Sequence, residues 1–97
     1  MVKRIMVTLA RAHTLPAPAT VEEATPLGQK VKANVTVDAY WVKSLCQLND
    51  EGKIVKILCE WNAVDVEPIR KVLARSIPEL PLDGIYPRII VDSEDFR

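Results

Sequence analysis

The stretch that most constrains the fold runs from Tyr40 to Ala63 and is typical of a β-hairpin. Two apolar-rich runs of strand length flank a turn sequence from Asn49 to Gly52, and this combination predicts two antiparallel strands. A helical pattern of apolar residues begins directly afterwards, at Asp65. The hairpin and this helix together predict about half of the fold.

The segment after the hairpin predicts an amphipathic helix from Asp65 to Ile77. Asp65 is a favourable N-cap, and Pro68 falls in the first turn, where its missing N–H has no helical partner to lose. Apolar side chains recur at helical spacing and form one stripe, namely Val66, Ile69, Val72, Leu73 and Ile77. Pro78 then ends the helix, because proline cannot continue it.

Each end of the chain predicts one further strand. Lys3 to Ala12 alternates between two faces, and its core face carries Ile5, Val7 and Leu9. Ile85 to Val91 predicts the last strand, and Pro87 confines that strand to a sheet edge or a bulge.

The stretch between the first strand and the hairpin predicts a loop and a weak helix. His13 to Ala19 contains two prolines, which favour a loop. Thr20 fits a capping box, whereas Pro26 offers a second helix start, and both cannot begin one regular helix. We therefore expect a short turn after Thr20 and a main helix from Pro26 to Asn34, with Leu27 and Val31 facing inward.

The order strand, helix, strand, strand, helix, strand is that of a ferredoxin-like βαββαβ domain. We therefore predict an α+β fold in which two helices cover one face of a four-stranded antiparallel sheet. The 97 residues fit a single domain, residues 1–97, with a modest core.

The hairpin register decides what lies on the sheet face that the helices leave open. A loop at residues 49–52 places Cys46 and Ser44 toward the helices and pairs Trp41 with Glu60 on the open face. The open face then gathers five apolar side chains, namely Met6, Trp41, Leu45, Ile54 and Leu58. We expect a second copy to cover this face, sheet to sheet about a two-fold axis, with a small cavity between the sheets. A monomer with scattered surface apolar residues is the alternative.

Composition excludes several classes of function. Thirteen basic and thirteen acidic residues cancel, so there is no global positive field to hold nucleic acid, and the first strand has no aromatic residue to stack on bases. No run approaches the roughly 20 apolar residues of a membrane helix. Three glycines and no glycine-rich motif leave no phosphate-binding loop, and no cofactor is expected.

Two cysteines are too few for the disulfide framework of a small secreted domain, so we expect a reducing, cytoplasmic setting. Both Cys46 and Cys59 fall on the predicted helix-facing side and are expected to be core thiols. The run from Ile5 to Ala10 imitates a signal peptide, but Arg11 and His13 interrupt it after about six residues, short of the 7 to 15 of a secretory segment.

Six residues are candidates for ligand binding, namely His13, Trp41, Lys43, Glu60, Tyr86 and Arg88. His13 is the only histidine, and because one imidazole without a second ligand is a weak metal signal, no metal site is predicted. Glu60 beside Trp41 is suited to proton transfer in an apolar cavity, or else forms a salt bridge with a lysine such as Lys43. Tyr86 and Arg88 share one face of the last strand and could bind an anionic or planar ligand. No catalytic residue is assigned.

Four segments carry a resemblance to a known family, namely Tyr40–Ser44, Lys56–Ala63, Asp65–Val72 and Leu82–Ile85. They resemble small, largely uncharacterised proteins with the dimeric ferredoxin-like α+β barrel fold, some of which are described as nickel-binding. The resemblance implies this fold and this assembly. Its metal-binding members use histidines that include some on the second helix, where this chain has Arg70, Lys71 and Arg75, so no metal ligand carries over.

From these observations we expect a cytoplasmic homodimer that binds a small ligand or acts as an accessory protein. Two other functions stay open. One is a cofactor-independent monooxygenase or isomerase of the dimeric barrel type, with Glu60 or His13 as the base, and the other is a nickel-binding protein. The sequence does not decide whether the protein is an enzyme.

Overall fold

The computed structural model describes residues 6–89 and 91–96. Their elements are β1 (Val7–Ala19), α1 (Val21–Asn34), β2 (Ala39–Leu48), β3 (Ile54–Ala63), α2 (Val66–Ser76), β4 (Gly84–Pro87) and the short 3-10 helix η1 (Ser93–Phe96). The order β-α-β-β-α-β confirms the predicted ferredoxin-like α+β fold.

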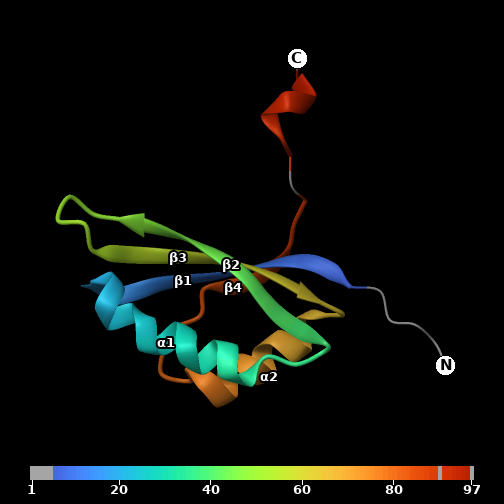
Figure 1. Cartoon of the computed structure of the whole chain (residues 1–97), viewed down its shortest axis with the longest axis horizontal. Coiled ribbons are helices and arrows are strands. Elements are labelled where there is room, and N and C mark those ends of the chain that lie inside the picture. Colours follow the sequence, from blue (N-terminus) through green and yellow to red (C-terminus); the bar gives the residue numbers. More distant parts are fainter. Residues whose placement is uncertain (1–5, 90, 97) are drawn as a thin grey trace.

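The four strands form one antiparallel sheet in the order β2-β3-β1-β4. Both helices lie on the same side of this sheet, and the opposite side carries no helix of the βαββαβ unit (Figure 1). β4 is an edge strand, as Pro87 predicts, because a proline in a central strand would remove a ladder hydrogen bond.

The hydrophobic core lies between the helices and the sheet. It is centred on Trp61, which is the largest fully buried side chain of the described residues. The helix α2 contributes the buried side chains Ile69, Val72 and Leu73, and Ile77 follows directly after it, so the predicted apolar stripe is confirmed. Among the described residues, neither helix is long and apolar enough to cross a bilayer.

β1 continues well past the predicted end of the first strand, and the loop predicted over His13 to Ala19 is wrong. Thr14 pairs with a residue of β3, and so does Ala19, with a register shift between these two pairs. In the described ladder the residues from 15 to 18 have no partner, so the prolines among them remove no ladder hydrogen bond. The predicted start at Lys3 lies outside the described residues, as does Ile5.

α1 is one helix that begins after Thr20. The Thr20 hydroxyl accepts a hydrogen bond from the Glu23 N–H at 3.1 Å, and the Glu23 carboxylate accepts one from the Thr20 N–H at 3.0 Å, which completes the capping box. Pro26 therefore lies inside the helix, and the predicted break before it is wrong. Leu27 and Val31 face the core as predicted.

The hairpin forms over the predicted residues, but its register differs from the predicted one. β2 and β3 close around a loop at residues 49–53, in which Gly52 has a φ of 76°, a left-handed conformation that glycine adopts without strain. The longer loop and an unpaired Val55 on β3 together place Ser44 opposite Cys59, whereas the predicted register places it opposite Ile57.

Two register shifts change which face two side chains occupy. Val42 on β2 and Val55 on β3 are each an extra residue in the ladder. Because one extra residue reverses the alternation, Trp41 and Ile54 face the helices and line a cavity there. Their predicted places on the open face are wrong.

The last strand is shorter than predicted, since β4 ends at Pro87 rather than Val91. After Arg88 the chain leaves the sheet, and η1 stands clear of it on the side away from the helices (Figure 1). Three apolar side chains of this segment are strongly exposed, namely Ile89, Val91 and Phe96.

Candidate functional site

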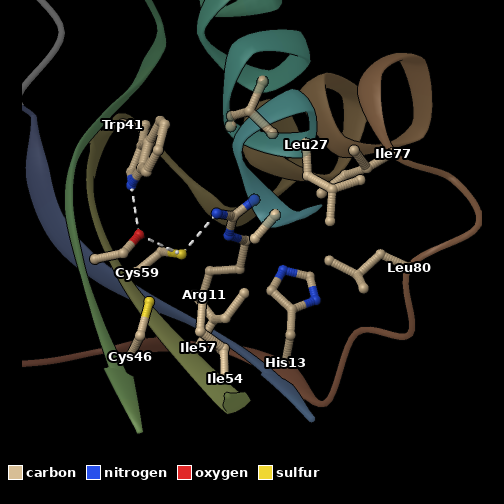
Figure 2. Close-up of a pocket in the computed structure, with 14 residues that line it drawn as sticks. Arg11, His13, Leu27, Trp41, Cys46, Ile54, Ile57, Cys59, Ile77 and Leu80 are labelled. Atoms are coloured by element: carbon tan, nitrogen blue, oxygen red, sulfur yellow. Dashed lines mark hydrogen bonds between the residues drawn. The ribbon is translucent and has the colours of Figure 1, made fainter. Parts of the chain in front are cut away.

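A cavity of about 120 Å³ lies between α1 and the helix-facing side of the sheet (Figure 2). Its wall is mainly apolar, with Leu27, Val31, Ile54, Ile57, Ile77 and Leu80. The polar groups come from the three neighbouring strands: Arg11 and His13 from β1, Trp41, Ser44 and Cys46 from β2, and Cys59 from β3. The site therefore combines an apolar enclosure with a few polar atoms, as small-molecule sites do.

Arg11 is the most unusual residue of this cavity. It shares the inward face of β1 with Leu9, and it is only 3% exposed. Its Nη2 donates a hydrogen bond to the Cys59 sulfur at 2.6 Å, and its guanidinium carbon lies 5.2 Å from the centroid of the Trp61 ring, a cation–π contact. Its Nε and Nη1 are buried without a hydrogen-bond partner among the described residues.

The Cys59 sulfur is also held from the side of β2. The Trp41 indole N–H donates to the Ser44 hydroxyl at 3.0 Å, and that hydroxyl donates to the sulfur at 2.9 Å. The bulge at Val42 makes this chain possible, because it brings Trp41 and Ser44 to the same face of β2. The dashed lines in Figure 2 follow this chain from the indole to the guanidinium of Arg11.

His13 is the second buried polar residue of the cavity, with 2% of its surface exposed. Its Nδ1 lies 2.6 Å from the Pro81 carbonyl oxygen, so Nδ1 carries a hydrogen and donates it. Burial lowers the pKa of His13; the Pro81 hydrogen bond opposes this effect, while the nearby charge of Arg11 adds to it. The neutral ring then leaves Nε2, which has no partner among the described residues, as an acceptor.

An open groove continues from the cavity toward solvent. It lies between α1 and the hairpin and shares five lining residues with the cavity, namely Ala24, Gly28, Trp41, Cys46 and Ile54. Arg11 lines only the inner cavity, His13 lines this cavity and two further hollows outside the groove, and Lys32 lines only the groove. Arg11 thus lies at the inner end of a continuous apolar passage, away from the groove.

The open face of the sheet carries a second group of polar residues. Arg88 donates a hydrogen bond to the Glu60 carboxylate in a largely buried ion pair, and Lys43 lies opposite Glu60 in the ladder. The exposed pair Leu45 and Leu58 lies beside them. This face therefore presents an ion pair next to an apolar patch.

The structure divides the predicted ligand-binding residues between the two faces. His13 and Trp41 line the cavity beneath α1. The other four lie on the open face of the sheet. Lys43, Glu60 and Arg88 line one small hollow there, and Tyr86 shares their face because it pairs with Ala10, the residue of β1 that also pairs with Glu60. The predicted loop begins at His13, but this residue is buried within β1.

Two further expectations about the site change. Cys59 is a core thiol as predicted, but Cys46 is exposed at the junction of cavity and groove. Sequence reasoning also missed Arg11. The signal that could have found it is its place on the inward face of the first strand, two residues after Leu9 and two before His13.

Comparisons with known proteins add no relative to this description. No family model, no curated protein and no solved structure matches the chain. The functional argument therefore depends on the geometry of the two faces.

Proposed function

We propose that this protein binds a small ligand in the cavity beneath α1. The observation that carries the proposal is the buried Arg11 guanidinium, which has free donors on Nε and Nη1 and no carboxylate partner among the described residues. A buried charge is unfavourable unless it is paired, and a bound ligand would supply the missing partner. The unpaired Nε2 of His13 offers a second polar contact at the same site.

The test is a fragment screen by two-dimensional amide NMR. Ligands of the cavity should shift the signals of residues on β1, β3 and α1 that surround Arg11. The variant Ala24→Leu, which adds bulk where cavity and groove join, should weaken binding about tenfold or more, a loss of roughly 1.4 kcal/mol. The control Ala33→Leu adds the same bulk at an exposed position of α1 and should leave binding unchanged.

The proposal includes a homodimer that forms through the open sheet face. Its support is the cross-strand pair Leu45 and Leu58, which are 66% and 42% exposed, next to the ion pair of Glu60 and Arg88. The projecting segment after β4 adds three exposed apolar side chains on the same side of the sheet. A second copy packed sheet to sheet would cover Leu45 and Leu58 and remove their apolar surface from water.

Sedimentation equilibrium tests the assembly. The unaltered protein should sediment as a dimer, and Leu45→Glu should sediment as a monomer because it would bury a carboxylate in the interface. Val37→Glu is the matched control, since Val37 is exposed in the turn before β2, and it should remain a dimer. A monomeric unaltered protein would refute the assembly and leave the cavity proposal standing.

The binding hypothesis is favoured over the two alternatives by contacts of the candidate residues. The pairing of Glu60 with Arg88 gives that carboxylate a structural role, so an enzyme that uses Glu60 as a base stays a prediction without support. Nickel does not fit the cavity, because the Arg11 cation lies beside His13 and Cys59 and would repel a metal ion. Nor do the described residues contain three metal-binding side chains in one cluster. Membership of the dimeric barrel family and a cytoplasmic location belong to the same proposal.

A further inference from the structure

The polar groups of the cavity are arranged for a particular kind of ligand. Arg11 supplies the cavity's one permanently charged group, and its free N–H groups are donors only. Around it the wall is apolar, and the passage toward solvent is apolar as well. A ligand that satisfies this arrangement has one anionic group at its inner end and a hydrocarbon group behind it.

Building on the proposed binding function, we infer that the cavity ligand is a small monocarboxylate with an apolar substituent. Its carboxylate would accept hydrogen bonds from Arg11 at the inner end, and the substituent would pass Trp41 and Cys46 toward the groove (Figure 2). Hydrogen bonds between a guanidinium and a carboxylate are charge-assisted and are stronger than neutral ones.

The size of the cavity supports a single carboxylate over a larger anion. Its volume of about 120 Å³ is close to that of cavities known to hold a benzene-sized guest, which are about 150 Å³. A phosphate monoester or a dicarboxylate would bring a second negative charge that Arg11 alone would leave uncompensated in an apolar site. One charge and a short hydrocarbon group match both the volume and the lining.

Charge also favours a carboxylate over a neutral guest. The guanidinium of Arg11 donates to the Cys59 sulfur and lies over an indole ring, and neither of these partners is a carboxylate. A neutral amide or alcohol could accept a hydrogen bond but would leave the buried charge unbalanced. The difference in affinity between an acid and its amide therefore measures how much the negative charge of the ligand contributes to binding.

The experiment compares hexanoate with hexanamide by calorimetry and amide NMR on the full chain. Hexanoate should shift the cavity signals and bind at least about tenfold more tightly than hexanamide, which has the same shape without the charge. Arg11→Met should abolish this preference, and Arg11→Lys should keep part of it. Lys32→Met removes a charge at the groove instead, and it should change hexanoate affinity by less than about threefold.

The outcomes separate this inference from the proposed function. If hexanamide binds in the cavity as tightly as hexanoate, or if Arg11→Met keeps the preference for the acid, the cavity binds ligands but the carboxylate assignment is wrong. If other fragments bind there and hexanoate does not, the assignment is also wrong. If no compound shifts the cavity signals, the binding function itself fails.

Discussion

Arg11 and Cys59 stand directly opposite each other on the two central strands, and the guanidinium Nη2 lies 2.6 Å from the sulfur. This pairing fixes a positive charge in the middle of the sheet, beneath α1 and away from solvent. Glu60 forms no ion pair with Arg11, although it is the neighbour of Cys59 in the chain. Its side chain lies on the opposite face of the sheet and is paired with Arg88. The Arg11 guanidinium is thus a buried cation without a carboxylate partner among the described residues, and the proposed ligand would provide that carboxylate.

The first prediction concerns the cost of this buried charge. Arg11→Met should raise the free energy of unfolding by about 1 kcal/mol, because methionine fills much of the same volume without a charge to desolvate. Urea unfolding followed by tryptophan fluorescence measures the change. A loss of 2 kcal/mol or more, roughly what breaking a needed buried contact costs, would mean that Arg11 stabilises the fold rather than serving a ligand.

Arg88→Met is the matched comparison on the open face. The same substitution there removes the partner of the largely buried Glu60 carboxylate, so the free energy of unfolding should fall by about 1 kcal/mol or more. Opposite signs for the two variants are the expected result, since one arginine lacks an acidic partner and the other has one.

The second prediction is a loss of stability in mild acid that depends on His13. Burial lowers the pKa of His13 in the folded protein below its ordinary value near 6.5. As the pH falls through that value, the unfolded chain takes up a proton that the folded protein does not yet bind, so the free energy of unfolding decreases between about pH 7 and pH 5. Above pH 7 this contribution is fully present.

His13→Asn tests the assignment. The asparagine amide can still donate to the Pro81 carbonyl but does not titrate, so stability should become nearly independent of pH in this window. The chain has one histidine, and so no second imidazole confuses the measurement. If His13→Asn keeps the full pH dependence of stability, a group other than His13 causes that dependence.

The fold class could be predicted from the sequence because the strongest patterns are local. The apolar stripe of α2 and the two runs of the hairpin predict three of the six βαββαβ elements, and the turn residues between the runs set their order. The extension of β1 could not be predicted, because Pro16 and Pro18 cannot donate ladder hydrogen bonds and therefore favour a loop over a paired strand. Only the register with β3 reveals that residues 15–18 have no such partner.

The candidate site was harder to predict than the fold. Trp41 was expected on the open face, and a single bulge at Val42 moved it to the cavity, because each extra residue reverses the alternation of a strand. Arg11 was missed for a different reason. Charged residues are almost never buried without a partner, so general rules place an arginine at the surface even on the inward face of a strand.

The third prediction concerns Pro26 inside α1. Proline cannot donate to the carbonyl one turn earlier, at Glu22, and its ring crowds that carbonyl. Pro26→Ala should therefore raise the free energy of unfolding by roughly 1 to 3 kcal/mol, less the entropy that alanine restores to the unfolded chain. Pro18→Ala, at an exposed position of β1 that has no described ladder partner, should give no such gain. Stabilisation by the second variant alone would contradict the assignment of Pro26 to the helix interior.

The fourth prediction uses the two thiols as reporters of the cavity. Cys46 is exposed where cavity and groove meet, whereas Cys59 is buried, so a thiol reagent should modify Cys46 alone in the folded protein. Burial, and then the nearby Cys59, raise the pKa of the Cys46 thiol, so its labelling at pH 8 should be slower than that of a free cysteine.

Ligand binding should slow this labelling further. If a carboxylate occupies Arg11 with its hydrocarbon group beside Cys46, saturating hexanoate should lower the labelling rate several-fold, and hexanamide at the same concentration should not. Mass spectrometry of the labelled chain over time gives both rates, and Arg11→Met supplies the control in which hexanoate loses its effect. Equal protection by acid and amide would show that the passage is apolar but does not recognise charge, because only the guanidinium distinguishes the two compounds.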